Sequence, residues 1–179
     1  MNDKLSKALQ RRQVLDNLKP HIRAAGGPVT ENTVKLSFNE SPYGPAPEAR
    51  QAYIDASNSI GTYGDGQQTE LREALAKVHD LPAENILCGN GSDELISLLI
   101  RAFLDSGSEI VLSENGFVNT RTHAIVAGAK IVSVAEQNWT VDVDAVLAAI
   151  SPATRMVSIC NPNNPAGTFV DRANLRQIV

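Results

Sequence analysis

The sequence predicts an α/β fold in which helices cover a mostly parallel sheet. The first observation is that, after Asp80, short apolar segments alternate with segments of helical pattern. The second is that these short segments are rich in Val and Ile without polar alternation, which is typical of strands buried on both faces of a parallel sheet. Composition agrees, because 42% of the 179 residues are hydrophobic, which is ordinary for one soluble domain with a core.

The alternating part predicts each element from its own residues. The predicted strands are residues 85–89, 109–113, 130–134 and 156–160, and the predicted helices are 92–105, 118–127 and 143–150. Gly128 can end the second of these helices in a left-handed conformation, and Asp171 can cap a final helix. The chain stops at Val179, inside that last helical pattern. A finished domain would rarely end there, so we expect an incomplete domain.

The first half of the chain is less regular. Residues 1–33 are expected to form an N-terminal arm, because their apolar residues are loosely spaced and proline and glycine then break the pattern. Residues 34–179 are expected to form the domain. It would open with a short strand at Val34–Phe38, followed by a turn and by helices at 47–58 and 67–79. The second helix shows an apolar face of Leu71, Ala74, Leu75 and Val78.

Charge and apolar runs exclude several classes of protein. The net charge of −4 offers no basic face for nucleic acid. The N-terminus lacks the apolar core of a signal peptide, and no stretch approaches about 18 uninterrupted apolar residues, so we expect neither secretion nor membrane spanning. Cys88 and Cys160 each end an apolar run, which favours free buried thiols and a reducing cytoplasm. We expect no metal site.

The segment GNGSDELISLLIRAF predicts an anion site. A strand runs into a glycine-rich turn and then into a helix, with Ser92 as the expected cap. Backbone N–H groups of Gly91, Ser92 and Asp93 would lack helical acceptors there, and the helix dipole favours a phosphate. A capped helix with glycine in the turn gives the same pattern without any ligand. The segment is neither a dinucleotide fingerprint nor a Walker loop, because Glu94 replaces the third glycine and no Gly-Lys-Ser/Thr follows.

Two further segments follow predicted strands at the same edge of the sheet. CNPNNPAGT contains asparagine amides that can donate to an oxyanion, although for Asn161 and Asn163 a structural turn is the favoured interpretation. Phe117 in SENGFVNTR offers an aromatic face for a flat heterocycle, while a lone Phe at a helix start more often belongs to the core.

Together these segments resemble a known family. SFNESPYGP, YGDGQQTELREALA, GNGSDELI, ENGF and NPNNPAGT occur in the order and spacing of histidinol-phosphate aminotransferases, which belong to the fold-type I pyridoxal-phosphate enzymes. The resemblance covers about residues 34–179. The family usually has Thr where this chain has Ala166. It implies the large three-layer αβα domain of fold-type I, truncated before the Schiff-base lysine.

The resemblance implies a cofactor role for five residues. Gly91, Ser92 and Asp93 would hold the phosphate of pyridoxal 5′-phosphate, as the helix-start argument also indicates. Phe117 would stack on the pyridine ring. Asn164 would donate to the 3′ oxygen of that ring and so tune the cofactor as an electron sink.

Three residues of the first half also gain roles from the resemblance. Tyr63 would reach the cofactor phosphate of a neighbouring subunit in a homodimer, and the alternative is that it simply packs within a flexible glycine-flanked loop. Tyr43 and Asn39 would line the substrate site near its mouth, where the Pro-Tyr-Gly turn also has a purely structural interpretation.

The implied reaction is transamination of histidinol phosphate and 2-oxoglutarate to imidazole acetol phosphate and glutamate, in histidine biosynthesis. The partners would be amino-acid and 2-oxo-acid small molecules. A related aminotransferase or decarboxylase acting on another amino acid is one alternative, and a non-catalytic remnant that binds only phosphate or a partner fragment is another. The family's lysine motif is absent, so no catalytic residue is assigned and the chain alone is expected to be inactive.

Overall fold

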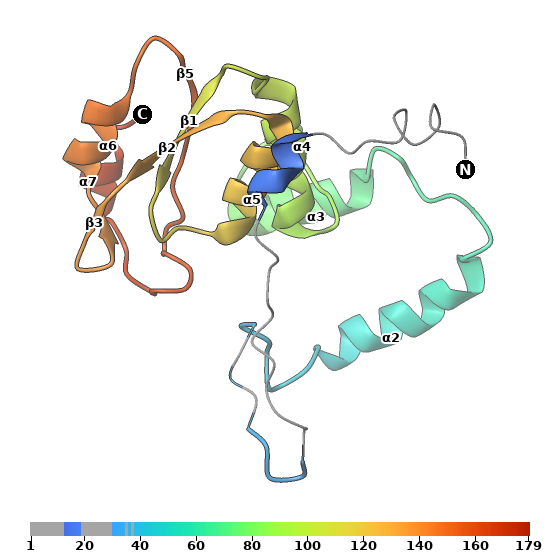
Figure 1. Ribbon diagram of the computed structural model, residues 1–179. Coiled ribbons are helices and arrows are strands. Elements are labelled where there is room, and N and C mark those ends of the chain that lie inside the picture. Colours follow the sequence, from blue (N-terminus) through green and yellow to red (C-terminus); the bar gives the residue numbers. More distant parts are fainter. Residues whose placement is uncertain (1–12, 19–29, 35, 37) are drawn as a thin grey trace, which may run out of the picture. The chain divides into compact units, whose positions relative to one another are not determined.

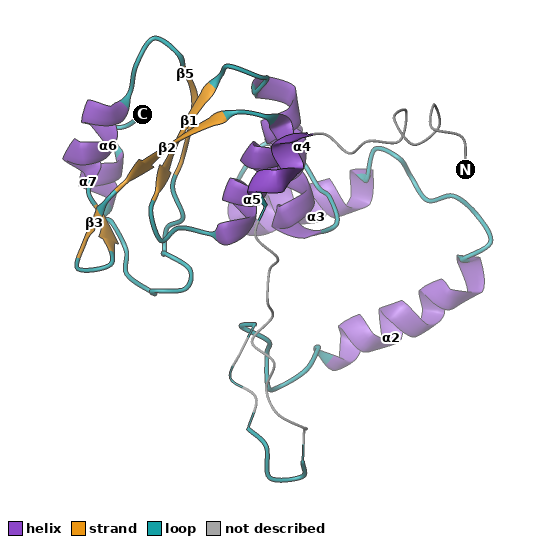
Figure 2. Cartoon of the chain, in the orientation of Figure 1, coloured by secondary structure: helices purple, strands orange, loops and turns teal. Residues whose placement is uncertain are grey.

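The computed structural model describes residues 13–18, 30–34, 36 and 38–179. By its internal contacts the chain divides into two units, one of Pro20–Leu87 and one that combines Met1–Lys19 with Cys88–Val179 (Figures 1 and 2). The expected arm of residues 1–33 lies largely outside the described residues. Its described part includes a 3-10 helix, η1 (Gln13–Asn17).

The larger unit contains the predicted parallel sheet. Three strands, β1 (Glu109–Ser113), β2 (Lys130–Val134) and β5 (Thr154–Ser158), pair in parallel in the order β2-β1-β5. Around them lie the helices α4 (Gly91–Phe103), α5 (Val118–Ala127), α6 (Val143–Ala149) and α7 (Arg172–Leu175), with a hairpin of β3 (Glu136–Gln137) and β4 (Thr140–Val141). η1 packs against α5. The α/β prediction is confirmed.

The core forms two layers on opposite faces of the central strand. All five residues of β1 are buried, and consecutive side chains of a strand point to opposite faces. Ile110 and Leu112 pack with α4 and α5 through Ile100 and Ala124. On the other face, one cluster joins Val111 to α6, β4 and the segment before α7; its buried members are Val111, Val134, Val141, Val146 and Val170. Helices therefore cover both faces of the sheet.

Local sequence signals explain where several helices begin and end. Gly128 ends α5 with φ 84°, the left-handed conformation that was expected. The side chain of Asp142 accepts a hydrogen bond from the N–H of Ala145 and caps α6. Asp171 does the same for α7 through the N–H of Asn174, as the sequence predicts. These residues fix the end of α5 and the starts of α6 and α7.

Two further predicted strands do not form within the described residues. Residues 85–89 form the end of a 3-10 helix, η3 (Ala83–Asn85), and then an extended segment without a pairing strand. Val34 and Leu36 are exposed and unpaired, Phe38 has φ 70°, and residues 35 and 37 lie outside the described residues. Apolar residues in a short segment favour an extended backbone but supply no partner strand, and pairing is what defines a sheet.

The other predicted elements agree with the structure at their boundaries or differ by one or two residues, and 109–113, 118–127 and 130–134 match without a shift. The last strand lies two residues earlier than predicted, at Thr154–Ser158. The helix predicted at 92–105 is α4 (Gly91–Phe103), and the one predicted at 143–150 ends at Ala149. Ser92 is not the cap of α4, because Asn90 holds that position.

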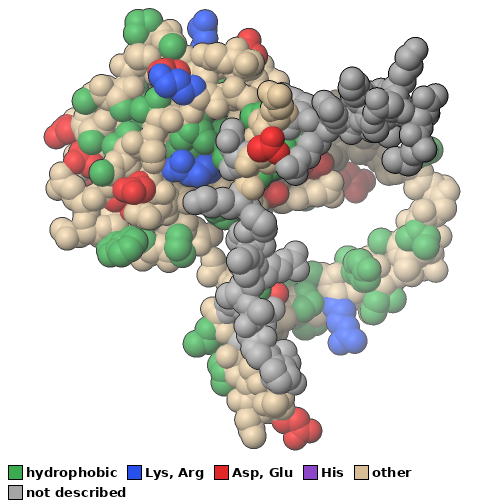
Figure 3. Space-filling model, in the orientation of Figure 1, with side chains coloured by type: hydrophobic (Ala, Val, Ile, Leu, Met, Phe, Trp, Pro, Cys, Tyr) green, Lys and Arg blue, Asp and Glu red, His purple; other side chains and the backbone are tan. Residues whose placement is uncertain are grey.

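The smaller unit is helical and has little core of its own. It contains α2 (Pro47–Ala56), a 3-10 helix η2 (Ser57–Ser59), α3 (Thr69–His79) and η3. Neither α2 nor α3 has a buried residue, and the apolar face predicted for α3 exposes Leu71 and Val78. Hydrophobic side chains are therefore visible at the surface of α2 (Figure 3). Asp65 accepts hydrogen bonds from the N–H groups of Gln67 and Thr69 and fixes the start of α3.

Within the described residues, membrane-spanning helices, metal-binding clusters and disulfides are absent. No helix there is long and apolar enough to cross a bilayer. No group of three or more His, Cys, Asp and Glu side chains in the described ranges is arranged to hold a metal ion. Cys88 and Cys160 are free thiols and are half-buried.

Glu109 at the start of β1 gives a pH-dependent contribution to stability. Lys130 Nζ lies 2.6 Å from its Oε1 and Ser151 Oγ lies 2.8 Å from its Oε2. The hydrogen bond from Lys130, followed by that from Ser151, holds the pKa of Glu109 below its ordinary value of 4.5. A carboxylate whose pKa is depressed in the folded state stabilises the fold at pH values above its ordinary pKa. This stabilisation is lost as the pH falls through the folded-state pKa.

We therefore expect Glu109→Gln to lower the urea midpoint at pH 7, with a difference from the unmodified chain that shrinks toward pH 3. Equilibrium urea unfolding at both pH values measures this. Glu114→Gln is the matched control, since that exposed carboxylate has no hydrogen bond or ion pair within the described residues. A difference that stays constant with pH contradicts the assignment.

Candidate functional site

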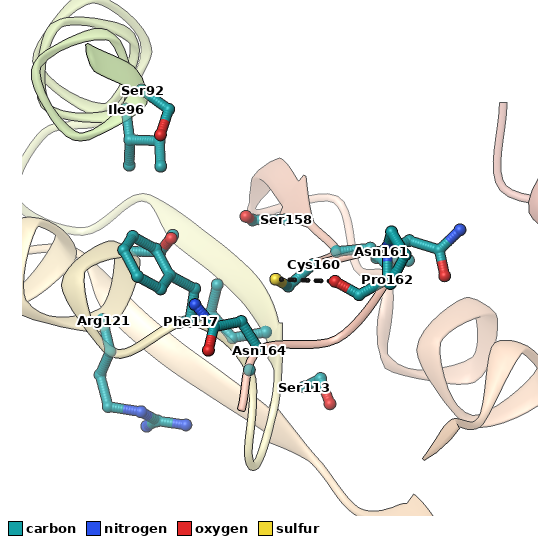
Figure 4. Close-up of a pocket in the computed structure, with 14 residues that line it drawn as sticks. Ser92, Ile96, Ser113, Phe117, Arg121, Ser158, Cys160, Asn161, Pro162 and Asn164 are labelled. Carbon is teal, nitrogen blue, oxygen red and sulfur yellow. Dashed lines mark hydrogen bonds between the residues drawn. The ribbon is translucent and has the colours of Figure 1, made fainter. Parts of the chain in front are cut away.

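A cavity of about 450 Å³ opens at the carboxyl ends of β1 and β5, beside the start of α4. This is the edge at which open α/β sheets bind ligands. Figure 4 shows the side chains of Ser92, Phe117 and Asn164 around it. The remaining lining comes from α4, β1, α5 and the segment after β5: Ile96, Leu112, Ser113, Gly116, Thr120, Arg121, Ser158, Ile159, Cys160, Asn161 and Pro162. Three segments that are distant in the sequence thus meet at one cavity.

The start of α4 presents free donors to this region. Gly91 begins the helix with φ 79° and its N–H donates to the carbonyl of Gly89 at 2.8 Å. The N–H groups of Ser92 and Asp93 have no acceptor among the described residues, as expected for the first turn of a helix. The predicted set of three backbone donors is therefore reduced to two.

Glu94 and Gly89 shape this turn. Glu94 Oε2 accepts from the backbone N–H of Asn90 at 2.6 Å and from its side-chain amide at 3.2 Å. A Cβ at Gly89 would lie 2.8 Å from the same Glu94 oxygen and 3.0 Å from Leu95 Cδ2. A side chain at position 89 would therefore displace the Glu94 carboxylate from its hydrogen bonds with Asn90.

The Asp93 side chain does not line the cavity. Its Oδ1 accepts from Asn119 Nδ2 at 2.7 Å and lies 3.2 Å from His123 Nε2. Both partners belong to α5, so this carboxylate joins the start of α4 to α5. Asp93 can therefore contribute only its backbone N–H to a ligand, while its side chain fixes the start of α4 against α5.

The three asparagines of the asparagine loop, which we define as residues 161–168, have different environments. Asn161 pairs with Val170 in both directions, at 3.1 Å and 2.8 Å. Asn163 is 5% exposed and donates to Glu136 and to the carbonyl of Trp139. The structural interpretation of these two agrees with their contacts. The half-buried Asn164 lines the cavity, and its amide has no hydrogen bond within the described part of the chain.

Phe117 and Arg121 complete the wall on the α5 side. Phe117 is the half-buried N-cap residue of α5 and lines the cavity. Arg121 is the one cationic residue in that lining, and its Nη2 donates to Ser133 Oγ at 3.0 Å. Arg121 was not predicted. It lies four residues after Phe117, in the first turn of the helix predicted at 118–127, and this spacing was a usable signal.

Residues 31–179 match the family model described as aminotransferase class I and II. The chain belongs to this aminotransferase family. The resemblance in the motifs is thereby confirmed, and the fold-type I assignment agrees with the structural neighbours of this aminotransferase chain.

Curated relatives of the aminotransferase chain carry the name histidinol-phosphate aminotransferase. The Maricaulis maris protein is 41% identical over 172 residues, covering 96% of this chain and 48% of that protein. The Granulibacter bethesdensis protein is 44% identical over 151 residues, covering 84% of this chain and 41% of that protein. The chain therefore spans less than half the length of these relatives.

Solved structures show the same fold. Histidinol-phosphate aminotransferase from Sinorhizobium meliloti, in complex with pyridoxal-5′-phosphate, is 29% identical with a TM-score of 0.74, covering 77% of this chain and 38% of that chain. N-succinyldiaminopimelate aminotransferase from Mycobacterium tuberculosis is 26% identical with a TM-score of 0.67, covering 74% and 38%. Aminotransferases with different named substrates thus share this scaffold.

The remaining predicted residues of the aminotransferase chain lie in the smaller unit. Tyr63 and Tyr43 are almost fully exposed, and Asn39 is exposed in a turn with φ 53°. Of the predicted residues, Ser92, Phe117 and Asn164 are thus brought to one cavity, and Gly91 and Asp93 flank Ser92 at the helix start.

Proposed function

We propose that this chain positions pyridoxal phosphate within an enzyme that transaminates histidinol phosphate and 2-oxoglutarate. The observation that carries the proposal is the cavity of about 450 Å³ with Ser92, Phe117 and Asn164 in its lining. Its volume lies within the usual range for small-molecule sites, about 300–1,000 Å³. Unpaired backbone N–H groups can bind a phosphate, an aromatic ring can stack on a pyridine, and an amide without a hydrogen bond can donate to a ring oxygen.

Each residue has a role that its surroundings support. The free N–H groups of Ser92 and Asp93, at the positive end of the α4 dipole, would bind the phosphate. Phe117 would stack on the ring and exclude water from one face. Asn164 would donate to the ring's 3′ oxygen. The bound cofactor would supply the electron sink for amino-group transfer, and these residues would fix its orientation.

The position of Lys130 supports non-covalent binding of the cofactor by this chain alone. In the sheet-bearing unit, the described residues include one lysine, Lys130. It begins β2, at the opposite end of the strands from the cavity, and pairs with Glu109. It is therefore not available as a cofactor anchor or as a proton shuttle. Residues 1–179 alone are expected to bind pyridoxal phosphate without turnover.

The substrates and assembly are part of the same proposal. The names of the curated relatives support histidinol phosphate and 2-oxoglutarate as the substrate pair. In a homodimer in the cytoplasm, Tyr63 would reach the neighbouring subunit's cofactor phosphate, and Asn39 and Tyr43 would line the substrate site. A protein of the relatives' full length that carries residues 1–179 should form glutamate from histidinol phosphate and 2-oxoglutarate. Glutamate formation from another amino donor alone contradicts this substrate choice.

Cofactor binding is tested by a pair of asparagine variants. Asn164→Ala should weaken binding of pyridoxal phosphate about fivefold, the equivalent of one hydrogen bond of about 1 kcal/mol, with unchanged stability. Asn161→Ala should lower the free energy of unfolding by roughly 1–2 kcal/mol, because it removes both contacts with Val170.

The measurements are quenching of the chain's single tryptophan, Trp139, on titration with pyridoxal phosphate, and urea unfolding of the free chain. Borohydride treatment of the complex should leave no stable adduct on a lysine. Quenching that does not saturate in the unmodified chain counts against the proposed site. So does an equal affinity for pyridoxal phosphate in the unmodified chain and in Asn164→Ala.

A further inference from the structure

We propose that Glu136 is a positioning residue that holds together the two loops bearing the cofactor-site residues. This inference rests on the proposed function for its catalytic meaning. Glu136 lies in β3, outside the lining of the cavity. Its carboxylate nevertheless contacts both loops that form the cavity wall.

The first of these is the phenylalanine loop, defined as residues 114–117, which leads from β1 to Phe117. Ser113 Oγ, at the end of β1, donates to Glu136 Oε1. The backbone N–H of Asn115 donates to the same oxygen at 3.3 Å, and Asn115 Nδ2 donates to Oε2 at 3.3 Å. Ser113 itself lines the cavity. The carboxylate therefore binds the segment that leads to Phe117 at both Ser113 and Asn115.

The second is the asparagine loop. Asn163 Nδ2 donates to Glu136 Oε1 at 3.2 Å, and Asn163 immediately precedes the cavity residue Asn164. The hairpin that bears Glu136 also contacts this loop through the carbonyl of Trp139, which accepts from Thr168 Oγ1 at 2.6 Å and from Asn163 Nδ2 at 3.4 Å. β3 and β4 thus connect the asparagine loop to the phenylalanine loop.

The chemistry of the contact requires a carboxylate. Four donors from three residues converge on two oxygens, and an ionised carboxylate has acceptor sites for all of them. A glutamine at position 136 would replace one oxygen by an NH₂ group that faces other donors. Loss of this contact would let Phe117 and Asn164 move relative to each other, and such displacement weakens a site that depends on both.

The test is hydrogen exchange of backbone amides combined with titration of pyridoxal phosphate, on residues 1–179. Glu136→Gln should accelerate exchange in both loops and weaken cofactor binding roughly fivefold, as for one lost hydrogen bond. The control, Glu114→Gln, removes the same charge within the phenylalanine loop itself, and the exposed Glu114 side chain has no hydrogen bond or ion pair among the described residues. This control should change neither quantity.

The outcomes separate this inference from the proposed function. Exchange in Glu136→Gln equal to that of the control overturns the positioning role, and so does accelerated exchange with unchanged cofactor affinity. If the unmodified chain does not bind pyridoxal phosphate, the proposed function fails, while the exchange data still decide whether Glu136 holds the loops.

A second variant addresses the case in which Glu136→Gln does not fold. Asn115→Ala removes the donor to Oε2 and should accelerate exchange in the phenylalanine loop but not in the asparagine loop. Unchanged exchange in the phenylalanine loop of that variant contradicts the proposal.

Discussion

Replacing Ser92 by Asp is expected to weaken binding of pyridoxal phosphate roughly 5- to 1,000-fold without unfolding the chain. A carboxylate about 4 Å from one phosphate charge costs roughly 1 kcal/mol in water and about 4 kcal/mol near a protein surface, and 1.4 kcal/mol is about tenfold in affinity. Ser92 lies in the first turn of α4 and in the cavity lining, so the new charge meets the proposed phosphate position.

The same substitution should leave the fold intact. An acidic side chain in the first turn of a helix interacts favourably with the helix dipole, by about 0.3–1 kcal/mol. Ser106→Asp is the control, because Ser106 is exposed beyond the other end of α4. Titration with pyridoxal phosphate and thermal unfolding are measured for both variants. Equal affinities for the two, with α4 intact, would show that the phosphate does not bind at this helix start.

The second large effect is expected from Asn163→Asp, which should lower the free energy of unfolding by about 3 kcal/mol or more. Asn163 is 5% exposed, and its amide nitrogen donates to the Glu136 carboxylate and to the Trp139 carbonyl. Aspartate would place a second carboxylate against the first in a buried site and remove both donations. The buried Asn163 Oδ1 already has no partner among the described residues, so no donor there would compensate either oxygen of the aspartate.

Urea unfolding at pH 7 measures this effect, with Asn138→Asp as the control. Asn138 lies in the turn of the same hairpin, is exposed and has φ 51°, a conformation that aspartate tolerates. The control should change stability little. If the two variants have the same midpoint, Asn163 does not hold the asparagine loop as its contacts indicate.

The parts of the fold that were predicted correctly are those that local pattern determines. Strands at 109–113 and 130–134 follow from short segments rich in Val, Ile and Leu, and α5 ends where Gly128 permits a left-handed residue. Residues 34–38 and 85–89 are also short segments with several apolar residues, yet they form no strand in the described residues. Composition describes the backbone a segment favours, whereas a strand also requires a partner that only the tertiary structure provides.

The candidate site likewise contains residues that were predicted from the sequence and residues that only the structure revealed. Ser92 and Phe117 were singled out because they begin a helix or follow a strand at one edge of a parallel sheet, whereas the family resemblance singled out Asn164 among the asparagines of its loop. Glu136 was not found, because its partners are between 21 and 27 residues away and no local pattern records that relation. Asn90, not Ser92, holds the cap position of α4, and the side chain that satisfies its N–H comes from Glu94. Long-range hydrogen bonds and the choice among adjacent polar residues required the structure.

The most direct test of the central claim is a two-dimensional ¹H–¹⁵N spectrum of residues 1–179 recorded while pyridoxal phosphate is added. The backbone amides of Ser92, Asp93 and Phe117 and the side-chain amide of Asn164 should shift together with one saturable binding curve, since they surround one cavity or begin the helix beside it. Shifts confined to other residues, such as Asp142 and Phe169, which line a separate cavity, or no saturable shift at all, would contradict it.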